Sequence, residues 1–374
     1  MKRTMQLTIP MATLLAMHIP AGYGQLFDSG SDGSLGPLVV SSSLALNMPS
    51  NGVFNFTTIT INGGHVLTFN RNALNTPVYL LATGDVVING GAEIQVEGSG
   101  GNQSANTDGG AGGPGGFDGG RAGADGQGPG AGRAGSSGSG ADAAGGGSYG
   151  TTGSGSTSTN RGSTYGSPLL VPLVGGSGGG GAPGGGGGGG GGAILIASST
   201  RIVHNGVIRV RGGSGSAADN RGSGGAIRLI APAVIGGGGF DASGSGNGRV
   251  RIDSIDRTGM SLSGPFSLGS FMTVFPPGNP RLDIIQAADT TIPEGTNVPV
   301  TVSLPFGSNT NRTVTVQARN FGGVVPIEVA LTSGIGQTVR IQTNIDNTTL
   351  NPATVTVPVA FQLNTPTTVK AWTR

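Results

Sequence analysis

The stretch VYLLATGDVVINGGAEIQVEGSGG, residues 78–101, decides the fold. It holds three short runs rich in Val, Ile and Leu, and Gly and Asn turn residues separate them. The unit returns at Ala193 as AILIASSTRIVHNGVIRVRGGSG, at Ala226 as AIRLIAPAVIGGGGFDASGSG and, more weakly, at Arg249 as RVRIDSIDRTGMSLSG. Because a repeat of about 20–30 residues with this pattern is typical of stacked coils, the sequence predicts an all-β chain containing a parallel β-helix, or β-solenoid.

Alternation with a period of two residues assigns the side chains of each coil to the inside or the outside. Outward positions place Gln95 and Glu97 beside Arg209, Arg211 and Asp241 of later copies, an arrangement that predicts a ladder of charge pairs more readily than a catalytic cleft. The predicted core positions are Tyr79, Leu81, Ile94, Val96, Ile194, Ile196, Ile208, Val210, Ile227, Leu229, Val250 and Ile252, with Phe240 and Ala242 in the third copy.

A glycine-rich segment, residues 102–192, divides the solenoid into an N-terminal part (25–101) and a C-terminal part (193–275). Between Gly98 and Gly192, 42 of 95 residues are Gly. Such a segment buries too little apolar surface to offset its ordering entropy, which favours disorder. The alternative is a packed polyglycine bundle, because glycine-lined extended chains approach closely when no Cβ intervenes.

Composition changes at the Pro-rich linker 276–280, after which Val and Thr alternate through 281–374. This pattern predicts an immunoglobulin-like β-sandwich without the antibody disulfide, since the chain has no Cys. Trp372 is expected in core or edge packing, with a sugar platform as the alternative. Strands are expected near 282–287, 298–304, 312–320, 326–332, 337–344, 354–361 and 367–373.

The N-terminus, residues 1–24, has the basic start, short apolar run and small residues typical of a secretory signal peptide. Its removal leaves 18 Lys and Arg residues facing 18 Asp and Glu residues, and Lys370 is then the only lysine. A neutral chain lacks the electrostatic basis for nucleic-acid binding, and no membrane-spanning segment is expected in the mature chain. The expected location is extracellular or at the cell surface.

Few residues are candidates for chemistry. The carboxylates of the solenoid are dispersed, and His65 and His204 each stand beside a Gly turn, where an exposed side chain is expected. Asp28 and Asp32 resemble the first half of a calcium loop, but Val39 stands where the closing Glu belongs, so they are weak calcium candidates. No catalytic residue and no other cofactor is predicted.

Several stretches together carry a resemblance to uncharacterised, glycine-rich secreted β-solenoid proteins of environmental bacteria, which are adhesin-like. They are FDSGSDGSLG (27–36), PVYLLATGDVVING (77–90), GGPGGFDGG (112–120) and the GGAI starts at 191 and 224. The resemblance covers about residues 26–253 and implies a surface or extracellular protein without catalytic residues. The C-terminal module resembles adhesin sandwiches in fold pattern only.

These observations predict a secreted structural or adhesive protein, in which the solenoid is a spacer and the sandwich a binding module. Its partners would be extracellular or cell-surface glycans, or further copies of the chain. Two alternatives stay open. Right-handed β-helices include polysaccharide lyases and hydrolases, and the repeat pattern also suits a subunit of an extracellular filament or matrix.

Overall fold

The computed structural model describes residues 27–102, 108–136, 143–155, 159–216, 219–260, 266–333 and 338–374. The expected signal peptide, residues 1–24, lies outside this part. The described chain is all-β. It contains no helix of the length and apolar character needed to cross a membrane.

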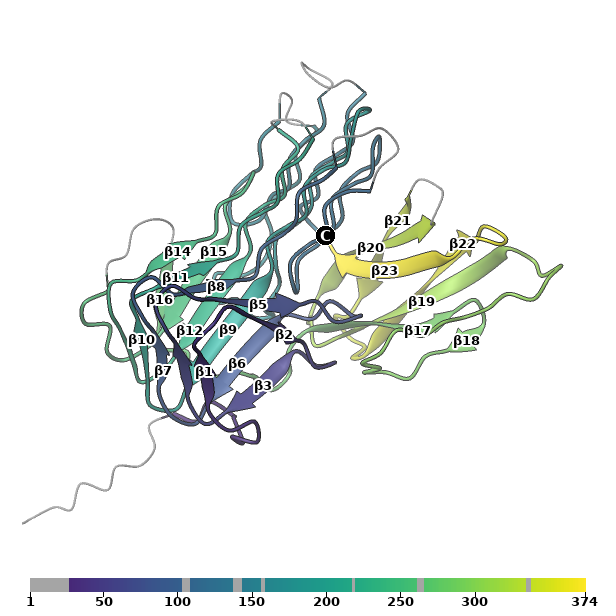
Figure 1. Cartoon of the computed structure of the whole chain (residues 1–374). Coiled ribbons are helices and arrows are strands. Elements are labelled where there is room, and N and C mark those ends of the chain that lie inside the picture. The colour runs from purple at the N-terminus through teal and green to yellow at the C-terminus, as the bar shows by residue number, and fades with distance from the viewer. Residues whose placement is uncertain are drawn as a thin grey trace, which may run out of the picture.

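Three parallel sheets form a three-sided stack of the β-helix or solenoid type, here called the β-helix body (Figure 1). The first sheet contains β1 (Leu38–Val40), β4 (Ile59–Ile61), β7 (Val86–Ile88), β10 (Arg201–His204) and β13 (Ala233–Ile235). The second contains β2 (Leu44–Asn47), β5 (Val66–Asn70), β8 (Glu93–Gln95), β11 (Val207–Arg209) and β14 (Gly239–Asp241). The third contains β3 (Val53–Phe56), β6 (Val78–Ala82), β9 (Ala193–Ser198), β12 (Ala226–Ile230), β15 (Arg249–Asp253) and β16 (Phe266–Gly269).

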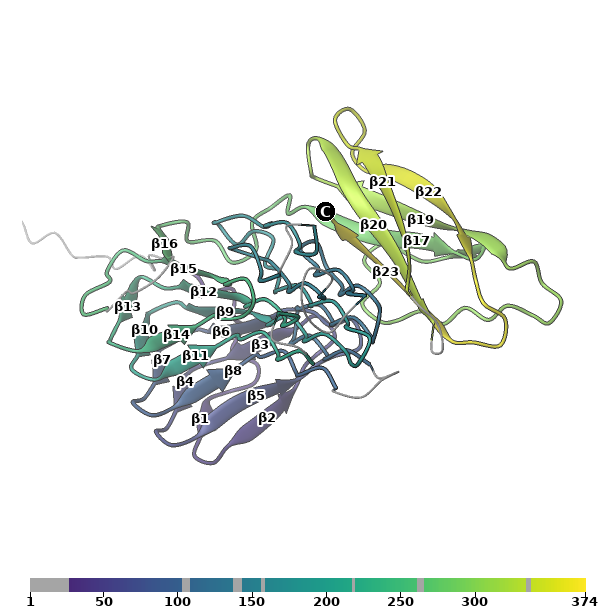
Figure 2. The same ribbon diagram turned by 90° about the horizontal axis from the view of Figure 1, so that it is seen from above.

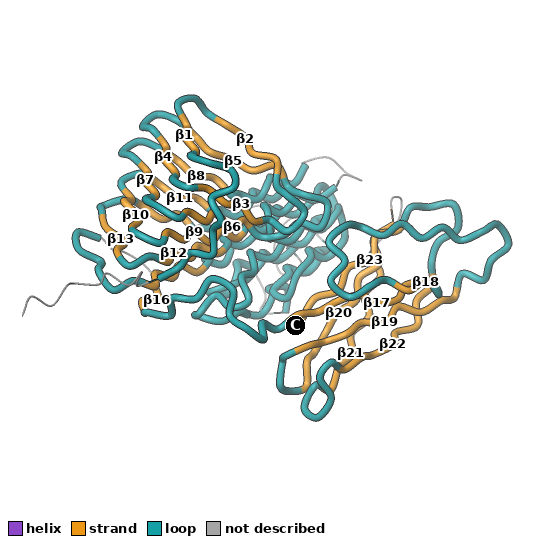
Figure 3. The backbone as a smooth tube through the Cα atoms, turned by 90° about the horizontal axis from the view of Figure 1, so that it is seen from below, coloured by secondary structure: helices purple, strands orange, loops and turns teal. Residues whose placement is uncertain are grey.

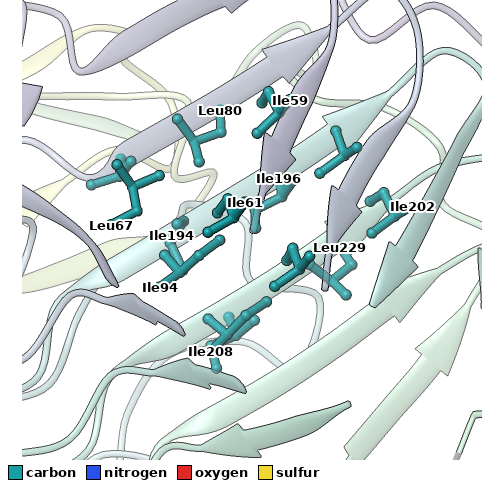
Figure 4. Close-up of a cluster of buried hydrophobic side chains, with 14 of the residues drawn as sticks. Ile59, Ile61, Leu67, Leu80, Ile94, Ile194, Ile196, Ile202, Ile208 and Leu229 are labelled. Atoms are coloured by element: carbon teal, nitrogen blue, oxygen red, sulfur yellow. The ribbon is translucent and has the colours of Figure 1, made fainter. Parts of the chain in front are cut away.

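From β1 to β15 consecutive strands belong to different sheets, so each turn of the chain adds one strand to all three sides (Figure 3). The inward side chains lie in columns. Ile94, Ile208 and Phe240 are consecutive partners in the second sheet, as are Ile194, Ile227 and Val250 in the third. Figure 4 shows these aliphatic side chains meeting in one apolar core, and the isoleucines among them that it labels are fully buried.

The register of β6 corrects one part of the sequence prediction. Val78 pairs with Ile194 and Leu80 with Ile196, so the expected inward positions Tyr79 and Leu81 are displaced by one residue. A shift of one residue turns a side chain to the opposite face of a strand. Leu81 is fully buried there, in a second cluster outside the third sheet, because residues from the glycine-rich segment cover that face.

The expected disorder of the glycine-rich segment is wrong for its described residues. Its chains are extended and hydrogen-bonded to one another, and they pack with residues 211–216, 219–225 and 242–248 into what we call the glycine-rich bundle (Figure 1). The glycine run 184–192 lies inside it. Gly186 and Gly189 donate N–H groups to Asn102 and Ser99.

Successive glycines of this run donate to three different neighbouring chains in rotation. Gly187 donates to Gly120, and Gly190 to Phe117; Gly188 donates to Asn220, and Gly191 to Ser223. Donors to one chain are thus three residues apart, which is the periodicity of a polyproline II helix. A Cβ on Gly190 would lie 2.0 Å from the Gly176 carbonyl oxygen, so the spacing between these chains requires glycine.

The C-terminal unit consists of two antiparallel sheets around a core of its own. One sheet contains β18 (Thr290–Thr291), β17 (Arg281–Ala287), β19 (Asn311–Arg319) and β22 (Ala353–Ala360) in that order. The other contains β21 (Val339–Asp346), β20 (Val324–Ser333) and β23 (Thr367–Thr373). The strand expected at 298–304 does not form, and this stretch belongs to a long connection between β18 and β19. Figure 2 shows the unit lying beside the glycine-rich bundle.

Candidate functional site

Asp28 and Asp32, the weak calcium candidates, have their carboxylates engaged in turns. An Asp28 oxygen accepts the Gly30 N–H at 2.9 Å, and an Asp32 oxygen accepts the Ser34 N–H at the same distance. Both are Asx-type turns, which an aspartate forms with its own backbone. Within the described residues no three or more His, Asp or Glu side chains gather as a metal would require.

The outward charges of the second sheet form a ladder across three coils. Arg209 binds Glu93 at 2.9 Å and Asp241 at 3.1 Å, and Arg211 binds Glu97 at 2.6 Å. Hydrogen bonds from Arg209 and then from Gln95 lower the pKa of Glu93 to about 2. The expected ladder is therefore present, but the ion-pair partner of Arg209 is Glu93 and not its register neighbour Gln95.

Other charges of the solenoid are paired as well. Asp85 binds Arg201 at 2.8 Å on the first sheet. On the outer face of the third sheet, the buried Asp253 binds Arg228 at 3.0 Å and Arg251 at 2.6 Å. Burial of an ion pair is favourable only when hydrogen bonds satisfy its remaining polar groups. Accordingly, Arg228 also donates to the carbonyl of Phe271.

The two histidines differ from each other, and one differs from its expectation. His204 is fully buried, because it follows Ile88 in an inward column of the first sheet. Burial lowers its pKa to about 4, although a hydrogen bond to the Gly239 carbonyl oxygen opposes the shift. The expectation of an exposed turn residue is wrong for His204; His65 is partly exposed.

A junction of polar and aromatic residues joins the C-terminal unit to the glycine-rich bundle. Lys370 lies 2.8 Å from Asp118, which also binds Arg71 of the β-helix body at 2.6 Å. Burial alone would raise the pKa of Asp118, but Lys370 and Arg71 outweigh it and lower the pKa to about 2. The only lysine after residue 24 thus binds an acidic residue of another structural unit.

Trp372 completes this junction. Its ring packs edge-on against Phe117 of the bundle, with centroids 6.0 Å apart, and the Arg340 guanidinium lies over its face. Arg340 also donates to the carbonyl oxygen of Gly126. Because Trp372 is buried, its ring is packing rather than an exposed platform for sugars. The sequence suggested packing for Trp372 but gave no sign of Phe117 as its partner.

The end of the C-terminal unit opposite the linker presents apolar side chains to solvent. The pairing of Asn311 with Ala360 places the residues just before Asn311 and the connection 361–366 at this end, whereas Arg281 and Arg319, which both bind Glu294, pair at the linker end. Phe306 occupies the tip of a β-turn closed by the Ser308 N–H and the Pro305 carbonyl, and it is 100% exposed. Exposed Leu363 stands in the connection 361–366. We call Phe306 and Leu363 the distal apolar tip.

Comparisons with known proteins found no match to this chain among protein-family models, curated proteins or solved structures.

Proposed function

We propose that this chain is a secreted extracellular structural or adhesive protein without catalytic activity. In this proposal the β-helix body and glycine-rich bundle are a rigid spacer, and the C-terminal unit is an immunoglobulin-like binding module. The observation that carries the proposal is the distal apolar tip, with Phe306 fully exposed at the end of the module farthest from the linker. An exposed aromatic ring offers apolar surface that a partner can bury.

The spacer role is supported by the use of charged side chains in the β-helix body. Its arginines hold carboxylates of neighbouring coils, as Arg209 holds Glu93 and Asp241. A carboxylate held by arginine is a poor general acid, because its pKa lies far below neutral pH. The junction at Asp118 and Lys370 would keep the module in one orientation relative to the spacer.

The partner class we favour is an extracellular or cell-surface glycan. An exposed Phe ring offers an apolar face of the kind that packs against the apolar face of a sugar ring, and the near-neutral chain would bring no strong charge preference. Binding is measured on a glycan array and on intact cells with the chain lacking residues 1–24. Burial of the Phe306 ring is worth about 1.5–3 kcal/mol, so Phe306→Ser is expected to weaken binding about tenfold or more.

Leu350→Ser is the matched control, because Leu350 is also exposed, at 66%, but stands at the linker end of the same unit. It should bind as the unaltered chain does. Equal binding by both variants, or no binding by the unaltered chain to any glycan or cell surface, would contradict the proposal.

The enzymatic alternative is tested with a panel of polysaccharides, by following new reducing ends and unsaturated products. We expect no turnover. Product formation that Asp241→Asn abolishes, while the fold is retained, would replace the adhesive proposal with a carbohydrate-active enzyme.

A further inference from the structure

The first coil of the β-helix body ends the stack with open strand edges. β1 and β2 are each the last strand of their sheet, and in Figure 2 no described segment lies beyond them. The third sheet differs, because Leu35 donates its N–H to the carbonyl of Asn55 and so covers part of the β3 edge. The open edges are therefore those of β1 and β2.

Backbone groups on these edges face away from the stack. Leu38 donates to the Thr58 carbonyl, and the Val40 carbonyl accepts from Asn62, so both residues face the second coil. In a parallel pair, alternate residues bond to opposite sides, which directs the N–H and C=O of Val39 outward. Since Met48 bonds to Asn70, the same alternation directs Ala45 and Asn47 outward on β2.

This end also lacks the devices that normally prevent edge-to-edge pairing. No Asp, Glu, Lys or Arg occurs from Gly33 to Asn70, and Val39 and Leu44 are exposed. Soluble proteins usually protect an open edge with charge, proline or a covering segment. The opposite end of the stack is protected in part, because Asp256 forms a bridge to Ala233 beside β13 and Asp241 places a charge on β14.

Within the described residues the chain does not pair with the edges of β1 and β2, and its contact from Asn297 of the C-terminal unit is to Ser50, in the turn after β2. Ser29 donates its N–H to the Ser199 hydroxyl at 3.0 Å, so the segment before the first coil starts beside the end of the third coil. The C-terminal unit lies to the side of the stack rather than beyond its first coil (Figure 2).

We propose that the first coil binds the first coil of a second copy of this chain, end to end, around a two-fold axis. A second copy presents strand edges with the matching three-sided spacing, and two uncharged ends do not repel each other. The two-fold axis makes the edge strands antiparallel and uses the same surface on both copies, so the assembly closes as a dimer. The bridge at Asp256 and the charge of Asp241 at the opposite end oppose head-to-tail growth.

This inference goes beyond the adhesive role and stands without it, because it concerns a different surface. A dimer that binds no glycan would refute only the adhesive proposal, and a glycan-binding monomer only the dimer. The dimer would present its two C-terminal units on one elongated particle.

The test measures molar mass by light scattering and sedimentation, from micromolar to millimolar concentrations of the chain lacking residues 1–24. The unaltered chain should be a dimer. Val39→Pro removes one outward N–H without removing a bond between coils, and Val39→Lys adds an edge charge; both should halve the mass with an unchanged circular dichroism spectrum. Ile255→Lys is the matched control, since Ile255 is exposed to a similar extent, 62% against 59%, at the protected end.

Several results would overturn the inference. They are a monomeric unaltered chain at every concentration, a dimer that persists in both Val39 variants, and growth into longer oligomers. Val39→Lys keeps the test decisive if Val39→Pro fails to fold, because the Val39 side chain is exposed and its backbone bonds are left intact. A dimer lost equally in Ile255→Lys would also contradict the proposed surface.

Discussion

The β-helix body and the glycine-rich bundle stack extended chains in different ways, although one continues into the other. Val96 donates to Arg209 in the body, and two residues later Gly98 donates to Arg211 at the start of the bundle. In the body the neighbouring coils are held by columns of aliphatic side chains. In the bundle the backbones themselves are in contact, and a side chain would separate them.

The difference shows what each region demands of its sequence. The body requires an apolar residue at every inward position of a column, because burial of side chains supplies its stability. The bundle requires the absence of Cβ atoms at positions such as Gly187 and Gly190, whose Cβ would lie 2.1 and 2.0 Å from a carbonyl oxygen, well inside van der Waals contact. Hydrogen bonds and close backbone packing, rather than apolar burial, hold the bundle together.

The largest effect is expected for Ile208→Asp, which tests the side-chain columns. Ile208 is fully buried between Ile94 and Phe240 of adjacent coils, so the variant places an unpaired charge in the core. The loss of unfolding free energy should be about 5 kcal/mol or more, measured by denaturant titration. Arg209→Ser, one residue further, should cost at most about 1 kcal/mol, because its ion pairs are partly exposed. Similar losses in the two variants would refute the assignment of faces.

A smaller effect is expected for Gly190→Ala, which tests the backbone packing. The new Cβ would lie 2.0 Å from the Gly176 carbonyl oxygen, so the chains must separate, at a cost of about 3 kcal/mol. Gly184→Ala is the control within the same glycine run, since nothing lies within 4 Å of its Cβ. The backbone amides of the bundle should exchange hydrogen faster in Gly190→Ala and at an unchanged rate in Gly184→Ala. Equal protection in both variants would contradict a close-packed bundle.

Sequence reasoning predicted the stack of coils because its signal is a repeat, and repeats are visible without knowledge of register. It failed at Tyr79 and Leu81 because VYLLA is apolar on both faces, so alternation cannot decide which face is inward. The structure buries both faces of this strand, one in the body core and one under the bundle.

The order of the glycine-rich segment was harder to predict for a physical reason. Arguments from composition count buried apolar side chains, whereas the bundle is stabilised by backbone contacts that leave only a spacing of three residues in the sequence. The contact between Phe117 and Trp372 at the junction could not be predicted for another reason. The two residues are 255 positions apart, and no repeat or motif relates them.

The smallest of these effects concerns His204, a polar residue in an otherwise aliphatic column of the β-helix body. It makes the stability of the body depend on pH. Because its pKa is about 4 when folded and about 6.5 when unfolded, the unfolded state takes up a proton first as the pH falls. The stability is therefore complete above pH 6.5 and declines toward pH 4. Between pH 7.5 and 5 the loss should be about 2 kcal/mol, measured by denaturant titration at each pH.

His204→Leu should abolish this decline, because Leu suits the column in which Ile88 precedes it. His65→Gln, at a partly exposed turn, should keep the decline and so controls for the loss of a histidine elsewhere. The carboxylates Glu93 and Asp118 do not obscure the result, since both have a pKa of about 2 and lose their contribution only as the pH falls below about 4.5. A decline of equal size in His204→Leu would show that the β-helix body is acid-sensitive for a reason other than the buried imidazole.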